Sequence, residues 1–139
     1  MIYFETEFDY DQVVDLIGKQ KHFRYFETRS QEIFDSHVHH VLLRDESTYV
    51  GYGHLDAELN KLWLGMCVFD PHQFKGYGKA ILKNLITRFT RIDIQIKYSK
   101  IHLTVDKENF SAINLYLSNR FRIVQQTDSI YYCERKCYV

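Results

Sequence analysis

The fold is decided by residues 62–89, which read LWLGMCVFDPHQFKGYGKAILKNLITRF. The first eight residues are nearly all apolar, as in a buried strand. From Tyr77 onward, apolar side chains recur at spacings of three and four residues, which is typical of one buried helix face. A loop with two glycines separates the two patterns. The stretch therefore predicts a strand, a glycine-containing loop and a helix of about four turns.

The loop Gln73–Lys79 has the features of an anion-binding site. The first turn of a helix carries backbone amides without intrahelical partners and the positive end of the helix dipole. Glycines at 76 and 78 lack the Cβ atoms that would keep a phosphate away from those amides. The spacing is neither a GxGxxG fingerprint nor a Walker loop. The residues alone predict a phosphate-binding loop of undefined ligand, with an ordinary helix start as the alternative.

The rest of the chain alternates between strand and helix patterns. Alternating apolar residues predict strands over 2–8, 40–44, 49–58, 99–105, 121–126 and 129–138. Helical spacing predicts a short helix between Asp9 or Asp11 and Gly18, a broken helix within 21–36, and a further helix carrying residues 112–117. This order of elements indicates an α+β domain.

Composition limits the class of protein. The 139 residues are 45% apolar, which is enough for a core and excludes a disordered chain. Eighteen basic residues balance eighteen acidic ones, which disfavours a nucleic-acid binder. Apolar runs are too short for a membrane span, and no signal pattern opens the chain. No linker or repeat appears, so we expect one domain over 1–139. The few cysteines, with Cys133 and Cys137 on one strand and too far apart to bridge each other, indicate a reducing cytoplasm.

Two motifs resemble the GNAT (Gcn5-related) N-acetyltransferase family. Gln73-x-x-Gly76-x-Gly78 resembles the family's Q/R-x-x-G-x-G/A loop, which binds the pyrophosphate of acetyl-coenzyme A. The segment Asn109–Phe121, NFSAINLYLSNRF, resembles its N-x-x-A-x-x-L-Y-x-x-x-G-F segment. The order of elements matches along the whole chain. The resemblance implies a mixed, mostly antiparallel central sheet of about six to seven strands flanked by about four helices.

The chain departs from the family pattern at three places. Asp70 stands where a proline is common, with Pro71 one place later. Arg120 replaces the usual glycine before the following strand, and we expect Asn119 to take over its left-handed conformation. No carboxylate lies within residues 62–69, where some members carry a catalytic Glu.

The resemblance implies acetyl-CoA as the co-substrate and no metal. Main-chain groups of Val68 and Phe69 are expected to pair with the pantetheine arm, and a backbone N–H of this strand to stabilise the thioester oxygen. Asn109 is expected to cap its helix and to contact the coenzyme. The coenzyme-binding residues expected from the resemblance are Met66, Cys67, Val68, Phe69, Gln73, Phe74, Lys75, Gly76, Tyr77, Gly78, Lys79, Asn109 and Tyr116.

Tyr116 occupies the position at which the family places its general acid. A departing thiolate, whose thiol has a pKa of about 8.5, leaves more readily beside a donor such as a tyrosine hydroxyl. Tyr116 also has the spacing of a core aromatic residue, which is the alternative interpretation. Cys67 has no base beside it in the sequence, so we interpret it as a buried structural cysteine rather than a nucleophile.

The base is the least specified role. An alkylammonium has a pKa of about 10.4, so a base or a water chain must take up its proton. His54 and Asp56 share one face of their strand, which we expect also to carry Val50 and Tyr52, and they are the predicted base candidates. A solvated strand end is the alternative for this pair. Further candidates are Glu58, Glu5 and His72, or water that relays to no single residue.

Three histidines, His37, His39 and His40, resemble a metal-binding cluster. Alternation along an extended chain would direct them to two different faces, and no nearby carboxylate or cysteine completes a tetrahedral set. We therefore predict no metal site.

The predicted function is an acetyl-CoA-dependent N-acetyltransferase in which a primary amine attacks the thioester directly. A small acceptor of the amino sugar or amino acid type is favoured, and an amine of a protein or peptide is an alternative. A non-catalytic acyl-CoA-binding regulatory module and a general nucleotide-phosphate binder are the other classes. No nucleic acid or membrane partner is expected, and the oligomeric state is open, a homodimer included.

Overall fold

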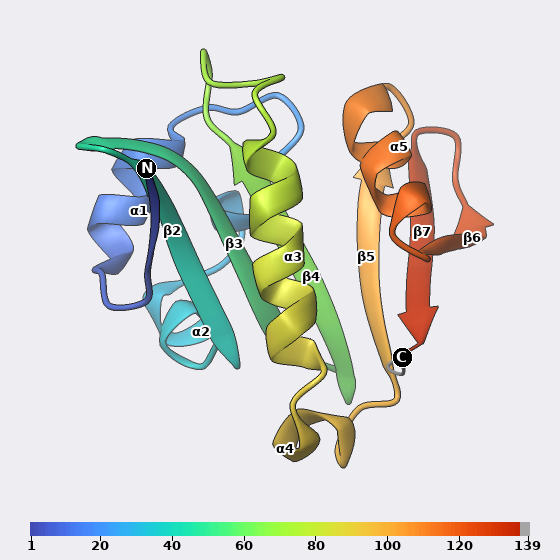
Figure 1. The fold of residues 1–139 in the computed structure, drawn as a ribbon. Helices are drawn as coiled ribbons and strands as arrows, with labels where there is room; N and C mark the ends of the chain where they lie inside the picture. Colours follow the sequence, from blue (N-terminus) through green and yellow to red (C-terminus); the bar gives the residue numbers. More distant parts are fainter. Residues whose placement is uncertain (137–139) are drawn as a thin grey trace.

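The structure is a computed structural model that describes residues 1–136. Within these residues, seven strands form one sheet in the order β1-β2-β3-β4-β5-β7-β6, in which only β4 and β5 are parallel neighbours (Figure 1). The strands are β1 (Ile2–Glu5), β2 (His39–Asp45), β3 (Thr48–Glu58), β4 (Lys61–Val68), β5 (Lys100–Asp106), β6 (Arg122–Gln126) and β7 (Ile130–Lys136). The predicted mixed, mostly antiparallel α+β fold is confirmed.

Helices cover both faces of the sheet. They are α1 (Tyr10–Ile17), the short 3₁₀ helix η1 (Tyr25–Glu27), α2 (Gln31–Asp35), α3 (Tyr77–Phe89), α4 (Ile92–Gln95) and α5 (Phe110–Ser118). Figure 1 shows α3 and α5 on one face and α1 and α2 on the other. Two core clusters correspond to these two layers: one centres on α3, and the other on Val13, Phe34 and Tyr52.

The contact between α3 and β3 depends on two glycines. A Cβ atom at Gly51 would lie 2.5 Å from the side chain of Ile81, and one at Gly53 would lie 2.6 Å from it. Side chains on this face of β3 would therefore push the helix away from the sheet. Because α3 follows directly on the glycine-containing loop, its close packing fixes the position of that loop against β4.

Strands β4 and β5 separate soon after they meet. Their parallel pairing comprises only Leu62 with Ile101 and Trp63 with His102, although β4 continues to Val68 and β5 to Asp106. Figure 1 shows the two strands side by side at one end and apart at the other, with α3 and α5 flanking the space. The backbone polar groups beyond the last pair are thus left without a strand partner on that side.

Most predicted elements are present. The expected helix break within 21–36 is confirmed, since η1 and α2 are separate short turns. Asn109 caps α5, because its side chain accepts a bond from the amide of Ala112. Helix α4 was not predicted, and Asp9 precedes α1 without a side-chain cap bond. The expectation for Cys137 lies outside the described residues.

Two local predictions are wrong. Asn119 has φ −115°, whereas Arg120 itself has φ +70° and so adopts the left-handed conformation. Asn119 instead donates its side-chain amide to the carbonyl of Leu115, which holds it at the helix end. Val50 does not share a face with Tyr52. The pairing of β3 with β2 is irregular at Val50, which has no partner there, and its side chain packs in the cluster centred on α3.

Replacing Arg120 with glycine should stabilise the protein, because a left-handed conformation costs a non-glycine residue about 1 kcal/mol. We expect Arg120→Gly to raise the free energy of unfolding by up to that amount in urea denaturation. Asn119→Gly is the matched control, and it should lose stability because φ is negative there and the bond to Leu115 is removed. A gain in the control, or a loss in Arg120→Gly, would contradict the assignment.

Candidate active site

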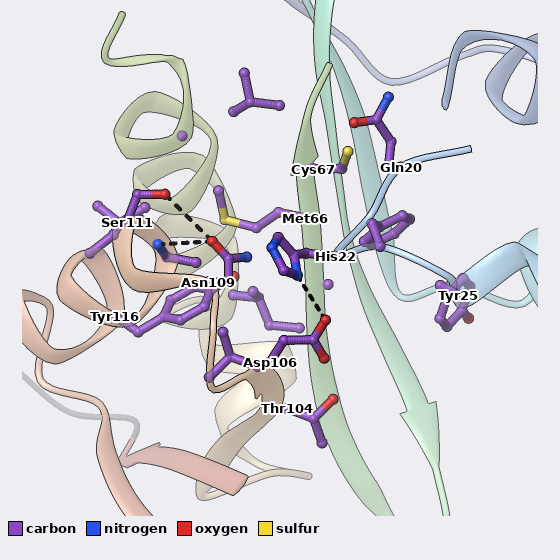
Figure 2. Close-up of a pocket in the computed structure, with 18 of the residues that line it drawn as sticks. Gln20, His22, Tyr25, Met66, Cys67, Thr104, Asp106, Asn109, Ser111 and Tyr116 are labelled. Atoms are coloured by element: carbon purple, nitrogen blue, oxygen red, sulfur yellow. Dashed lines mark hydrogen bonds and ion pairs between the residues drawn. The ribbon is translucent and has the colours of Figure 1, made fainter. Parts of the chain in front are cut away.

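A cavity of about 840 Å³ occupies the space between β4 and β5 (Figure 2). Its wall is built mainly from the segment after α1, the paired strands β3 and β4, the glycine-containing loop, and the end of β5 with α5, and Ile130 of β7 also lines it. The cavity therefore joins the anion-binding loop at one end to the polar ends of β3 and β4 at the other.

The main chain of β4 faces this cavity at alternate residues. The amide of Phe69 donates to the carbonyl of Val50 at 2.9 Å, so Phe69 directs its polar groups to β3. Because main-chain groups of successive strand residues point to opposite sides, Met66 and Val68 direct theirs into the space beside β5. The carbonyl of Val68 accepts a bond from the side chain of Gln73 at 3.3 Å.

The glycine-containing loop ends in the open N-terminus of α3. Gly76 precedes the helix with φ +85°, a conformation that favours glycine, and a Cβ atom there would meet nothing within 4 Å. A Cβ atom at Gly78 would lie 3.5 Å or more from Leu115, Met66 and Val68, in ordinary contact. The first amides of α3 are thus free of side-chain cover at the cavity mouth.

Most residues predicted to bind the coenzyme or to act in catalysis are brought together here. Those that line the cavity are Met66, Cys67, Val68, Gln73, Phe74, Gly76, Gly78, Lys79, Asn109, Tyr116, His54 and Asp56. Phe69, Lys75 and Tyr77 do not line it. Phe69 is buried in the core on the α1 side, and the hydroxyl of Tyr77 donates to Asp45 at the turn between β2 and β3.

Tyr116 projects from α5 into the cavity (Figure 2). Its ring packs edge-on against Phe121 at 5.6 Å, and only 6% of the residue is exposed. Burial, together with the nearby Cys133 and Cys67, raises its pKa. Among the described residues its hydroxyl has no hydrogen-bond partner. The phenol is therefore protonated at neutral pH and free to donate to a group in the cavity.

Cys67 lies on the opposite wall as a buried free thiol. Burial, reinforced by Asp70, raises the pKa of Cys67 to about 12. The thiol is therefore protonated at neutral pH, which favours a structural role over a nucleophilic one.

His54 and Asp56 are both buried at the far end of the cavity, with 2% of each exposed. The hydroxyl of Tyr25 donates to Asp56 Oδ2 at 2.6 Å. Burial raises the pKa of Asp56, although the bond from Tyr25 opposes the shift. Burial lowers the pKa of His54 well below its usual value. Asp56 is thus a stronger base than an ordinary carboxylate, whereas His54 is a weaker base than an ordinary imidazole.

The other base candidates are placed less favourably. Glu58 lines the cavity, but both of its oxygens accept bonds from Arg29 at 3.1 and 3.2 Å. Glu5 lies on β1, where it is bonded to Arg44 and Tyr49. His72 does not line the cavity.

The three histidines of the sequence cluster separate onto two faces, as expected, but His37 lies on the same side as His40 rather than His39, because it precedes β2. His37 Nδ1 and His40 Nδ1 lie 3.2 Å apart on the α2 side, while His39 Nε2 contacts Asn84 of α3 at 3.0 Å. Within residues 1–136 no group of three metal-ligating side chains is found. No helix in this part of the chain is both long and apolar enough to cross a membrane.

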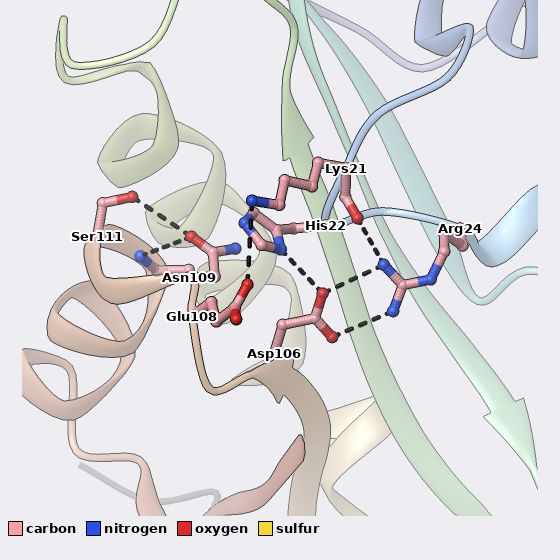
Figure 3. A network of polar contacts seen from close by, with 8 residues as sticks. Lys21, His22, Arg24, Asp106, Glu108, Asn109 and Ser111 are labelled. Atoms are coloured by element: carbon pink, nitrogen blue, oxygen red, sulfur yellow. Dashed lines mark hydrogen bonds and ion pairs between the residues drawn. The ribbon is translucent and has the colours of Figure 1, made fainter. Parts of the chain in front are cut away.

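A strap, residues 20–25, crosses the space between β4 and β5 (Figure 3). Asp106, at the end of β5, accepts a bond from His22 at 2.8 Å and two from Arg24 at 3.1 Å. Burial alone would raise the pKa of Asp106, but these bonds lower it. Lys21 and Glu108 lie 3.9 Å apart beside them. The sequence predicts only a broken helix within 21–36 and none of these contacts, because contacts over more than eighty residues leave no local pattern.

Comparison with known proteins gives one family and one fold. A family model described as the acetyltransferase (GNAT) family matches residues 5–120. No curated protein matches the chain by sequence.

Solved structures share the fold at low identity. The ribosomal-protein-S18-alanine N-acetyltransferase from Escherichia coli is 17% identical, with a TM-score of 0.75 over 100% of this chain and 96% of that one. PaiA N-acetyltransferase from Thermoplasma acidophilum, solved with coenzyme A, is 17% identical, with a TM-score of 0.73 over 98% and 99%. YncA from Salmonella typhimurium, solved with acetyl-CoA, is 12% identical, with a TM-score of 0.77 over 100% and 95%.

Gly65 on β4 makes room for the His54 ring, so Gly65→Ala should disturb the polar end of the cavity. A Cβ atom at Gly65 would lie 2.6 Å from His54 Nε2, and the ring is held between Tyr25 and His37 at 4.2 and 4.6 Å. We expect a loss of about 1–3 kcal/mol in the free energy of unfolding, measured in urea. Gly78→Ala, whose Cβ would make only ordinary contacts, should show no such loss.

Proposed function

The chain belongs to the acetyltransferase (GNAT) family, and we propose that it transfers an acetyl group from acetyl-CoA to a primary amine by direct attack on the thioester. One observation carries the proposal: a single cavity joins the amides at the start of α3, the hydroxyl of Tyr116 and the buried carboxylate of Asp56. An anion-binding loop, a proton donor and a base are the groups that this reaction needs.

Residues on β4 and α3 would hold the coenzyme. The amides at the start of α3, with Gly76 and Gly78 leaving them uncovered, suit its diphosphate. Met66 and Val68 offer main-chain groups along the open side of β4, which suits the amides of the pantetheine arm. The sequence analysis expected Val68 and Phe69 in this role, but the amide of Phe69 donates to the carbonyl of Val50 and so faces β3. Asn109, which caps α5, lines the same path.

Two proton transfers frame the reaction. Asp56 takes a proton from the acceptor ammonium, directly or through water, because its raised pKa makes it a stronger base than an ordinary carboxylate. A main-chain N–H of β4 faces the thioester oxygen as it becomes negative. Tyr116 donates its phenolic proton to the departing thiolate. The acetyl group passes to the amine, and no acyl-enzyme at Cys67 is needed.

A small acceptor suits the polar end of the cavity best. The strap closes the space between β4 and β5 on this side through its bonds to Asp106. Beside it, Arg29 and Glu58 form a bidentate ion pair next to Asp56. Groups of both charges in a confined space suit a compact amine with further polar groups, such as an amino sugar or amino acid. A peptide amine is the alternative, because the similar E. coli structure is named for a protein substrate.

The proposal is tested by adding acetyl-CoA with a panel of primary amines and following the release of free thiol. The panel should contain amino sugars, amino acids, polyamines and short peptides. We expect thiol release that depends on one class of small amine. Coenzyme binding without amine-dependent release would instead favour a non-catalytic acyl-CoA-binding module.

Tyr116→Phe should lower kcat by about 10²-fold or more, the usual contribution of a general acid, while the Kd for coenzyme A stays within about twofold. The fold should persist, because the hydroxyl bonds to no described residue. Tyr98→Phe, which removes a hydroxyl outside the cavity wall, is the matched control. Full activity in Tyr116→Phe would remove Tyr116 from this role.

Gly76→Val should weaken coenzyme A binding by about 10-fold or more, because loss of a charge-assisted hydrogen bond costs about 1.5–3 kcal/mol. Titration calorimetry measures the Kd. Gly18→Val is the control, since Gly18 also has a left-handed φ, +56°, but lies outside the cavity wall. Equal coenzyme affinity in both variants would contradict the phosphate loop. ATP competing as well as coenzyme A would indicate a general nucleotide-phosphate binder.

A further inference from the structure

We propose that Tyr25, His37 and His40 form a proton relay that carries the proton taken up by Asp56 away from the cavity and towards the protein surface. The inference rests on the proposed function, because it supplies the exit route for the proton that the acceptor amine must lose. The three residues come from η1, the turn after α2, and β2, so the relay joins segments that are separate in sequence.

An unbroken series of hydrogen bonds connects the four side chains. Asp56 Oδ2 lies 2.6 Å from the hydroxyl oxygen of Tyr25, which lies 2.9 Å from His37 Nε2. The other ring nitrogen of His37, Nδ1, lies 3.2 Å from His40 Nδ1. Each intermediate group can accept a proton on one side and donate one on the other, as a relay requires.

The series leads outward through an apolar surround. Asp56 is buried, whereas His37 and His40 are partly exposed. The His40 ring stacks on Phe34 at 4.5 Å and lies 4.6 Å from Phe8. Aromatic rings on both sides restrict water beside the series, so hydrogen-bonded side chains are the continuous polar route from the buried carboxylate.

Proton balance is simple. Asp56 accepts the amine proton and then donates to the Tyr25 oxygen, while the Tyr25 hydroxyl turns from Asp56 to His37 Nε2, which is unprotonated in the tautomer with its proton on Nδ1. One proton then moves at each bond: from Asp56 to the Tyr25 oxygen, from Tyr25 to His37 Nε2, and from His37 Nδ1 to His40 Nδ1. His40 releases one proton to solvent, so every relay residue ends with the proton count with which it began. Burial lowers the pKa of His37 to about 3, so its ring is neutral at pH 7 and passes the proton on without storing it.

Neighbouring charged and titratable groups do not interrupt the series. Arg29 and Glu58, beside Asp56, are bonded to each other. Near His40, the electrostatic partners are Asp35 and His39. His54 stacks on His37 and lies tilted against Tyr25, but its Nδ1 bonds to the hydroxyl of Tyr52, so it packs beside the relay without joining it.

The test compares Tyr25→Phe and His40→Ala with wild type, using acetyl-CoA and the amine that the wild type acetylates best. We expect each variant to lose about 10-fold or more in kcat, with KM for acetyl-CoA unchanged. Imidazole added to the assay should restore His40→Ala, because it can take the proton at the outer end. It should not restore Tyr25→Phe, where the break is internal.

Two matched controls separate relay from structure. Tyr10→Phe removes a hydroxyl in the same aromatic layer, one that donates to the carbonyl of Arg29. His39→Ala removes the adjacent histidine that faces α3. Both should keep the wild-type kcat. Loss of activity in His40→Ala that imidazole does not restore would identify a structural role and overturn the relay.

The possible failures are distinguishable. A wild-type protein that binds coenzyme A but acetylates no amine contradicts the proposed function, and the relay with it. Wild-type turnover that Tyr25→Phe and His40→Ala leave unchanged contradicts the relay alone. As a measurement independent of activity, nitrogen chemical shifts of the His37 ring should change in Tyr25→Phe, because the Nε2 bond is removed. Unchanged shifts would show that the bond does not exist in solution.

Discussion

The structure depends on the early end of the ladder between β4 and β5. Two residue pairs hold the strands together, and beyond them each strand pairs only with its outer neighbour. Buried main-chain groups without partners are unfavourable, so a strand edge facing an enclosed space is a site for an extended ligand. Met66 and Val68 lie on this edge, while α3 and α5 close the space on one face. The unpaired main-chain groups along β4 therefore define the site, and the side chains around them add to it.

On the face of the sheet covered by α1 and α2, polar groups are buried beside this space. Asp56 is 2% exposed and accepts bonds from two neutral groups, the Tyr25 hydroxyl and the Ala57 amide, while Arg29 acts on it only as a nearby charge and forms its ion pair with Glu58. Nearby Glu58, by contrast, is held by Arg29. Two carboxylates two positions apart on the same strand thus have different environments. The one bonded by neutral groups is suited to exchange a proton, and the paired one to fix the shape of the cavity.

Sequence patterns predicted the parts of the site that are local. The loop, the start of α3 and the capped α5 each follow from residues within one or two turns, and Tyr116 followed from a motif. The strap and the Tyr25 series did not, because Asp106 and His22 are 84 residues apart and Asp56 and Tyr25 are 31 apart. The left-handed conformation of Arg120 could not be predicted for another reason. Asn119 would tolerate that conformation better, but its side chain is bonded to the carbonyl of Leu115 at the helix end. Tertiary contacts decided both cases.

The cavity wall also bears on how a phenol with a raised pKa can serve as the acid. In water a thiolate whose thiol has a pKa of about 8.5 would not take a proton from such a phenol. Cys67 shows what the same environment does to sulfur, since burial raises its pKa to about 12. A thiolate leaving beside Cys67 and Tyr116 would lose hydration in the same way, and its affinity for a proton would rise towards that of the phenol. Desolvation then acts on donor and acceptor together, which raises the pKa of both groups and favours the transfer more than in water.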